Sequence, residues 1–202
     1  MPKVVDHEAR RQEIVEAAWR VIVREGIDGA TTRAIAREAG YSNGVLTHYF
    51  ADKADILLHA LRLSHQRIVR RLHTKLAAAH GLAALRALLL DNLPLDAPRA
   101  EETRLEIGFW GASLGRPGLA EVQRSEGGDL RDALRTLLDE AAAGGEIVSA
   151  EDPDDLVERL LALVDGLSLH HVLYPDRMPA ARVERLLLAE LDRVVPVPEE
   201  ER

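Results

Sequence analysis

The sequence predicts an all-α protein with a small N-terminal three-helix helix-turn-helix head and a larger C-terminal helical body. Apolar residues recur throughout the chain at the three-to-four-residue spacing of amphipathic helices, and no segment alternates as a half-buried strand would. Glycine and proline fall between these periodic segments, where helices begin and end. The 47% apolar content is enough for a sizeable core, which argues against a disordered chain.

Four helices are expected in the first part of the chain. The first runs from about residue 6 to residue 24, and Gly26 is expected to stop it in the left-handed conformation. The apolar face of this helix contains Ile14, Ala17, Ala18, Val21 and Ile22. The second covers about residues 32–39 and the third 43–49, with Ser42 as the N-cap of the third. Asp52 is expected to cap a long fourth helix.

Four or five further helices follow in the body. They are expected over about residues 82–93, 96–114, 117–144, 154–173 and 179–194. Asp152 and Pro153 form a strong start signal, because the carboxylate can cap a helix and proline is favoured in its first turn. Gly127 and Gly128 are candidates for a kink.

The net charge of −8 is divided unevenly along the chain. Residues 1–75 carry 13 Lys and Arg against 9 Asp and Glu, a net of +4, whereas residues 76–202 carry 13 against 25, a net of −12. A mildly basic head on an acidic body attracts phosphates to one end of the molecule. A chance fluctuation in a chain that is 30% charged is the alternative explanation.

Residues 31–50 carry the strongest functional signal. Two short helices separated by about three residues are typical of a helix-turn-helix, in which the second helix enters the major groove. Ala36 supplies a small side chain where the helices cross, and Gly40 supplies a positive φ at the bend. The residues expected to pin both helices to the core are Ile35, Tyr41, Leu46 and Phe50. An ordinary helical hairpin is the alternative, but a seven-residue polar helix buries too little to serve as scaffold.

This segment resembles the DNA-binding head of the TetR family over roughly residues 10–55. The family pattern appears here as Thr32, Ile35-Ala36, Ala39-Gly40, Ser42, Gly44-Val45-Leu46, Tyr49-Phe50 and Lys53. The resemblance implies a DNA-binding transcriptional regulator, typically a repressor that a small-molecule inducer releases. It also implies a DNA-binding domain over residues 1–53 and a ligand-binding and dimerisation domain over residues 54–202.

The resemblance assigns DNA contacts residue by residue. The phosphate contacts would be Thr32, Arg33, Tyr49 and Lys53. The candidate base contacts are Asn43, Val45, Thr47 and His48. The family usually has Tyr where this chain has Thr47, so one phosphate or base contact is missing or replaced. For each base candidate, a merely solvated side chain is the alternative.

Residues 106–113 and 163–167 resemble the choline-responsive repressors of betaine synthesis, a branch of the same family. Aromatic residues make up 3% of the chain, yet two of them are adjacent in this stretch and lie near carboxylates. A Trp face with nearby carboxylates suits an organic cation. The candidate ligand pocket is therefore formed by Glu106, Phe109, Trp110 and Asp165. The alternative is that the aromatic residues fill the core and that Asp165 is paired with a neighbouring Arg or His.

The last two predicted helices each carry a broad leucine stripe. In a monomer these stripes would leave a large apolar patch exposed. Pairing with a second copy would form a four-helix interface, which is also the usual arrangement in the family. We therefore expect a homodimer through the last two helices, which would bind a palindromic operator in double-stranded DNA.

Two other function classes are open at this point. A helical enzyme would have to use His170, His171, Asp165 and Glu106, but adjacent histidines point about 100° apart on a helix and make a poor metal site. The chain also lacks a Gly-rich phosphate loop and a nucleophile-elbow motif. We expect no enzyme activity, no metal and no cofactor. A DNA-binding regulator that responds to no ligand is the other alternative, and a solid core in the body would favour it.

Three further features suggest a cytoplasmic protein. The chain has no cysteine for a disulfide or thiolate site, and charges interrupt every apolar stretch before it could span a membrane. Residues 1–6 show no signal-peptide pattern.

Overall fold

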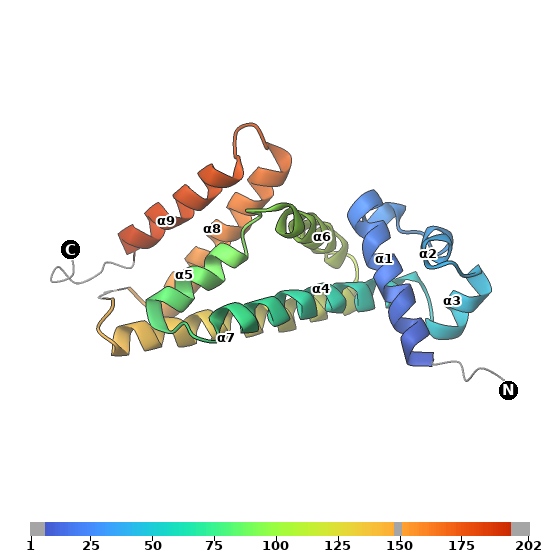
Figure 1. Cartoon of the computed structure of the whole chain (residues 1–202), viewed down its shortest axis with the longest axis horizontal. Helices are drawn as coiled ribbons and strands as arrows, with labels where there is room; N and C mark the ends of the chain where they lie inside the picture. The colour runs from blue at the N-terminus through green and yellow to red at the C-terminus, as the bar shows by residue number, and fades with distance from the viewer. Residues whose placement is uncertain (1–6, 148–150, 195–202) are drawn as a thin grey trace. The chain divides into compact units, whose positions relative to one another are not determined.

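The computed structural model describes residues 7–147 and 151–194, and every regular element within these ranges is an α-helix. The helices are α1 (His7–Gly29), α2 (Thr32–Ala39), α3 (Asn43–Tyr49), α4 (Lys53–Leu76), α5 (Gly81–Asp91), α6 (Ala97–Ser113), α7 (Pro117–Ala143), α8 (Pro153–Leu173) and α9 (Ala180–Val194), as Figure 1 shows. The predicted fold class is confirmed. In this part of the chain no helix has the length and apolarity needed to cross a membrane.

Most predicted helix boundaries agree with the structure, and the exceptions have local causes. Asp52 caps α4 through a 2.9 Å bond from the Asp55 N–H to its carboxylate, and Asp152 likewise accepts from the Asp154 N–H at the start of α8. Ser42 occupies the N-cap position of α3, but its hydroxyl makes no cap bond, so its predicted capping role is wrong. The helix α7 continues without interruption through Gly127 and Gly128, the pair that was predicted as a candidate for a kink.

Gly26 breaks α1 in a different way from the one predicted. Its φ of 74° is positive, but its ψ of 173° lies outside the left-handed helical region. This combination is accessible essentially to glycine alone. The chain turns sharply there and then adds one more helical turn, which buries Ile27. The prediction of a left-handed stop was wrong because a glycine pattern cannot distinguish these two positive-φ conformations.

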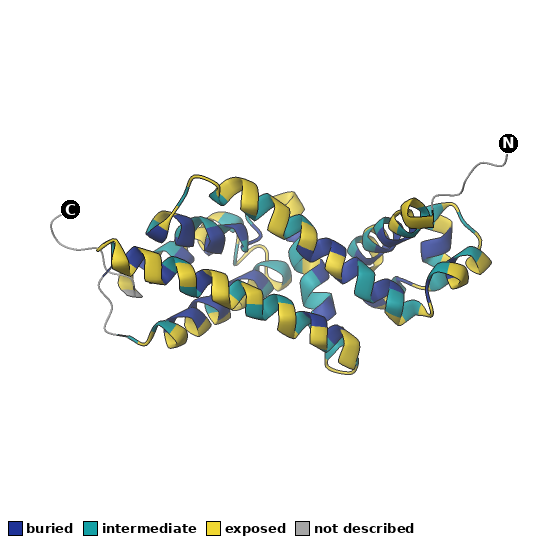
Figure 2. Cartoon of the chain, turned by 90° about the horizontal axis from the view of Figure 1, so that it is seen from below, coloured by how far each residue is buried: buried dark blue, intermediate teal, exposed yellow. Residues whose placement is uncertain are grey.

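The described chain divides into two compact units. The first contains residues 7–68 and 105–123, which are α1 to α3, the first part of α4, the end of α6 and the start of α7. Its hydrophobic core includes the predicted face of α1 together with Ile35, Leu46, Phe50 and Phe109. Figure 2 shows buried residues in dark blue and exposed residues in yellow on different sides of the same helices, as expected for amphipathic helices that pack on a core. The predicted boundary at residue 53 between a DNA-binding domain and a ligand-binding domain stays a prediction, because these units are defined by packing and not by function.

The second unit contains residues 69–104, 124–147 and 151–194. Its own core is built mostly from leucines of α5, α7, α8 and α9. Leu160, Leu187 and Leu191 are completely buried there. Much of the leucine stripe on α8 and α9 is therefore used within the chain, which corrects the expectation that it packs chiefly against a second copy.

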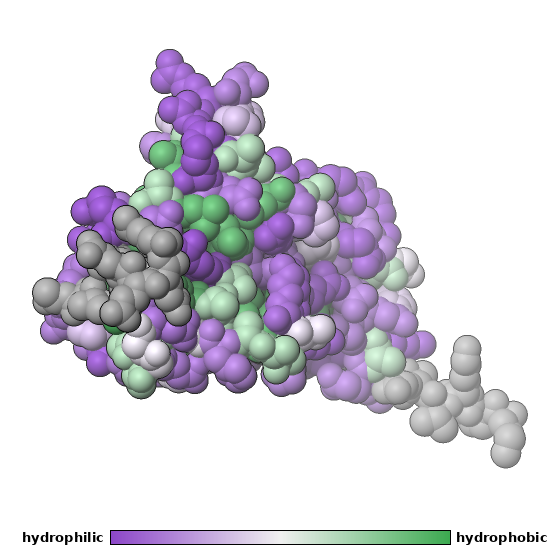
Figure 3. All heavy atoms as spheres, turned by 60° about the vertical axis from the view of Figure 1, so that its left-hand side comes forward, coloured by the Kyte–Doolittle hydropathy of each residue, from purple (hydrophilic) through white to green (hydrophobic). Residues whose placement is uncertain are grey.

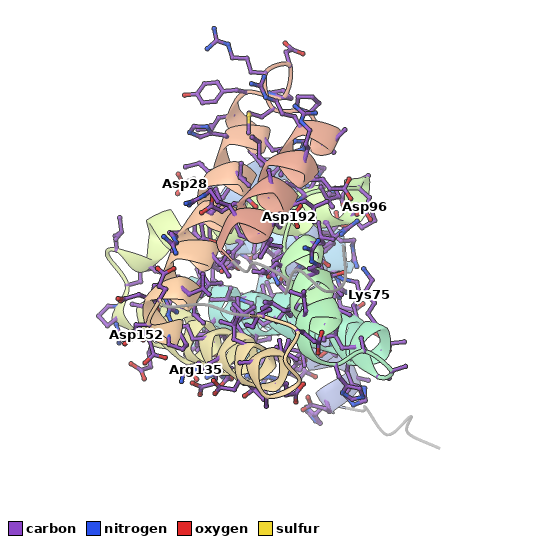
Figure 4. All side chains as sticks on the ribbon, turned by 90° about the vertical axis from the view of Figure 1, so that its left-hand side faces the viewer. Asp28, Lys75, Asp96, Arg135, Asp152 and Asp192 are labelled. Atoms are coloured by element: carbon purple, nitrogen blue, oxygen red, sulfur yellow. The ribbon has the colours of Figure 1, made fainter. Side chains whose placement is uncertain are left out.

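An ion-pair network ties α4, α5 and α6 together within the second unit. The carboxylate of Asp91, at the end of α5, is 1% exposed and accepts from Arg71 at 2.7 Å and from Lys75, which Figure 4 labels. Arg71 also donates to Glu102 on α6 at 2.8 Å. Burial lowers the pKa of Arg71, but the hydrogen bonds to Glu102 and Asp91 outweigh it and raise that pKa above its ordinary value.

Candidate nucleic-acid interface and ligand site

The first helix of the predicted helix-turn-helix, α2, is fixed at both ends. Thr31 is its N-cap, and the Thr31 hydroxyl accepts from the Ala34 N–H at 3.1 Å. Gly40 ends the helix at φ 74° and ψ 25°, the left-handed conformation that the bend was predicted to need. The Tyr41 N–H then donates to the Ala36 carbonyl at 2.9 Å, which closes the turn toward α3.

Ion pairs hold the outer side of α2 against α1. Glu38 accepts from Arg20 at 2.8 Å and from Arg24 at 3.1 Å. These hydrogen bonds, first from Arg20 and then from Arg24, lower the pKa of Glu38. On the adjoining turn, the Tyr41 hydroxyl donates to Glu13 of α1. The helix-turn-helix is thus bound to α1 by polar contacts as well as by its core.

The predicted recognition helix, α3, exposes three of the four predicted base contacts. Asn43, Thr47 and His48 are exposed, whereas Val45 is half-buried and packs against the first core beside the buried Leu46. The Thr47 hydroxyl donates to the Gly44 carbonyl at 3.0 Å, so its donor is used within the helix. A short helix with one face in the core and a polar face in solvent can present those polar residues to a partner.

The four predicted phosphate contacts lie around this helix pair in different surroundings. Arg33 is exposed in the first turn of α2, and Thr32 beside it is half-buried. Tyr49 ends α3 and is half-buried. The Lys53 ammonium donates to the Ile27 carbonyl at 3.0 Å, which links the first turn of α4 to the end of α1. Arg33 is therefore the better of the two cations for testing phosphate contact, because replacing Lys53 would also remove its bond to the Ile27 carbonyl.

Sequence reasoning missed two residues of α1 that lie beside the recognition helix. The His7 ring is centred 5.9 Å from that of His48 and 5.7 Å from that of Tyr49. The Arg11 guanidinium donates to the Tyr49 carbonyl at 3.1 Å and lies over the Phe50 ring. Both residues precede the helix-turn-helix at residues 31–50. The sequence offered no local signal for contacts between segments that lie so far apart in the chain.

On α4, His59 lies next to this contact. Arg11 hydrogen-bonds to it, and Asp55 lies 3.4 Å away. Burial, followed by the charge of Arg11, lowers the pKa of His59. Protonating His59 is less favourable in the folded protein than in the unfolded chain. Its protonation therefore opposes folding once the pH falls below the ordinary pKa of histidine.

Two of the four predicted ligand residues interact directly on α6. The Trp110 indole N–H donates to Glu106 at 3.1 Å, and the other Glu106 oxygen lies 3.2 Å from His65 of α4. The Glu106 side chain is 23% exposed and Trp110 is half-buried, so neither is sealed in the core. A partly exposed carboxylate beside an indole is a suitable arrangement for an organic cation.

The other two predicted ligand residues lie elsewhere. Phe109 is 0% exposed and belongs to the first core, as the core-filling alternative stated. Asp165 lies in the second unit, is exposed on α8 rather than buried, and acts electrostatically on Arg131 of α7. The sequence placed Asp165 with the other pocket candidates because it does not reveal which side of α8 faces the core.

His170 and His171, the candidates for an enzyme, have separate local partners. The His170 ring packs edge-on against Tyr174 at 5.5 Å, and His171 donates to the Met178 carbonyl at 2.8 Å. Both contacts stabilise the turn after α8.

Family models match both parts of the chain. Residues 14–60 match a model described as "Bacterial regulatory proteins, tetR family", and residues 81–196 match "BetI-type transcriptional repressor, C-terminal".

Curated proteins and solved structures show the same relationship. The chain is 35% identical to the HTH-type transcriptional regulator PksA of Bacillus subtilis over 96% of its own length and 94% of that protein. It is 30% identical to the regulator BetI of Serratia proteamaculans over 86% of each. A putative transcriptional regulator from Saccharomonospora viridis, solved in complex with choline, is similar with a TM-score of 0.88 and 25% identity, covering 95% of this chain and 100% of that one.

Proposed function

This chain belongs to the TetR family of transcriptional regulators and has a BetI-type C-terminal domain; we propose that it is a repressor that an organic cation releases from DNA. The observation that carries the proposal is α3, a short helix fixed on the core side by Leu46 and exposing Asn43, Thr47 and His48. In this proposal residues 1–53 form the DNA-binding domain, and residues 54–202 bind the ligand and the second copy.

The DNA contacts follow from exposure and chemistry. Asn43 and His48 would contact base edges in the major groove, and the Thr47 methyl would contact a thymine methyl. Val45 would contribute at the rim, since it is half-buried. Thr32, Arg33 and Tyr49 would bind phosphates on either side of α3, and Lys53 would do so in exchange for its bond to the Ile27 carbonyl.

The ligand would bind near Glu106 and Trp110. The Glu106 carboxylate supplies negative charge and the indole a polarisable face, which together suit a quaternary ammonium group. Choline is the leading candidate, because a solved regulator similar over nearly the whole chain holds it. Phe109 would then act from the core behind this pair.

A contact inside the first unit supports coupling between ligand and head. A Cβ placed at Gly108, between Glu106 and Trp110 on α6, would meet the Ile27 side chain at 3.4 Å. Ile27 also accepts the bond from Lys53 at the start of α4. A ligand that shifts α6 would therefore press on the residue that links α1 to α4. Such a ligand releases DNA to the extent that it binds more tightly to the conformation of the protein that is free of DNA than to the one that is bound to it.

In this proposal the protein is a homodimer through α8 and α9, and its two-fold symmetry would match a palindromic operator. The inner leucines of these helices fill the core, but Leu173 and Leu186 stay exposed on the outside. Figure 3 shows apolar atoms at the surface among hydrophilic ones, seen from the side where α9 ends. A second copy would cover such residues.

A regulator that responds to no ligand is the second candidate. The complete burial of Phe109 favours it, since a ligand would reach that ring only after its neighbours moved.

Selection of operator sequences from a random duplex pool tests the DNA-binding proposal. We expect a palindromic site, and Asn43→Ala should relax the preference at one base position with little loss of non-specific affinity. Arg33→Gln should weaken binding to all sequences and flatten the log-log salt dependence by about one unit. If both variants bound DNA like the parent at physiological salt, the assignment of α3 as the recognition helix would be wrong.

A further inference from the structure

The first turn of α1 packs against the end of the recognition helix through three rings. His7 is the first residue of α1, and its ring lies near both His48 and Tyr49 of α3 at the centroid distances given above. His48 meets Tyr49 edge-on at 5.2 Å, with an angle of 85° between the rings. His7 and His48 are both exposed. Two imidazoles thus flank a residue proposed to bind phosphate.

Charged groups of both signs lie on α1 and α4 in this region. On α1, Arg11 binds the Tyr49 carbonyl, and Glu8 acts electrostatically on His59 of α4. On α4, Asp55 accepts from the Ala51 N–H and lies next to His59. In the described part of the chain, the contacts of His7 and His48 are with rings rather than carboxylates.

We propose that His7 and His48 bind DNA as imidazolium ions, His7 at the backbone and His48 at a base edge, so that operator affinity rises as the pH falls. This inference rests on the proposed function, because it requires α3 to lie against DNA. An imidazolium carries a full charge and two N–H donors, whereas the neutral ring has no charge and one N–H. DNA binding and proton uptake are therefore linked.

Operator affinity measured between pH 8.0 and pH 6.0 at constant salt tests the proposal. Histidine titrates in this window, and we expect the parent to bind about tenfold more tightly at pH 6.0, with a log-log salt slope steeper by about one unit. His7→Gln should reduce this gain, and the double variant with His48→Gln should abolish it. Each variant is compared with its own affinity at pH 8.0, since His48 is also a candidate base contact.

Two control variants separate this effect from general protonation. His73→Gln changes an exposed histidine near the end of α4 and should keep the full pH dependence. His59→Gln removes the histidine whose protonation opposes folding, and circular dichroism confirms that each variant is folded at both pH values. A double variant with the parent's pH dependence would overturn the inference. A parent that binds its operator equally at both pH values would overturn the inference alone, whereas a parent that binds no DNA at pH 8.0 would overturn the proposed function as well.

Discussion

Gly44 occupies the second position of α3, where nothing in the chain itself requires glycine. Its φ is not positive, and the nearest atom that a Cβ would meet is the Ser42 hydroxyl, at 3.9 Å. Glycine inside a helix costs roughly 0.5–1 kcal/mol relative to alanine. Because glycine has no side chain, another molecule can approach the backbone of α3 closely at this exposed position. DNA is the partner that the family implies.

Gly44→Ala should therefore stabilise the protein and weaken it as a repressor. We expect the free energy of unfolding to rise by about 0.5–1 kcal/mol and operator affinity to fall, because the methyl group would meet the DNA. Urea unfolding and a DNA-binding titration measure the two effects. Gly118→Ala is the matched control, since Gly118 is likewise exposed, in open space and second in its helix. A Gly44→Ala protein that bound its operator as tightly as the parent would refute this role.

Asp91 holds the last turns of α4 to α5 by a buried charge, and its loss should destabilise the second unit. Asp91→Ala would remove the partner of Arg71 and Lys75, and breaking a buried pair costs about 3–5 kcal/mol. We expect the lower end, about 3 kcal/mol, because Arg71 keeps its bond to Glu102 and Lys75 reaches water.

Urea unfolding of Asp91→Ala measures this loss, and Asp192→Ala on α9 provides the contrast. Asp192, also labelled in Figure 4, accepts from Arg86 of α5 but is 65% exposed. Removing such a surface pair should cost no more than about 1 kcal/mol. Equal losses in the two variants would mean that the network around Asp91 does not stabilise the unit as described.

The helices and the turn were predictable because their signals are local. Gly40, Asp52 and Asp152 act on backbone groups within four residues of themselves, so sequence spacing is enough to locate them. The contacts of His7 with α3 and of Glu106 with His65 join residues far apart in the chain, and no periodicity reports them. The exposure of Asp165 depends on which face of α8 meets the core, which packing alone decides.

For the molecule as a whole, the proposed homodimer would form through the outer faces of α8 and α9. Leu186→Glu would place a charge at a 39% exposed leucine of α9 and should shift the protein from dimer to monomer at micromolar concentration, because the charge would be buried at the interface. Light scattering measures the mass. Leu114→Glu, at a leucine that is 93% exposed after α6, is the control and should leave the dimer intact. A parent protein that was already monomeric would contradict the interface.

Release of the selected operator by choline is the most direct test of the account. We expect saturating choline to lower the operator affinity of the parent by about tenfold or more, a coupling within the usual range for allosteric proteins. Glu106→Gln and Trp110→Ala should still bind the operator but lose this response, whereas Glu101→Gln, at an exposed carboxylate on the same helix, should keep it. An operator affinity that stayed constant at every choline concentration would contradict release by this cation.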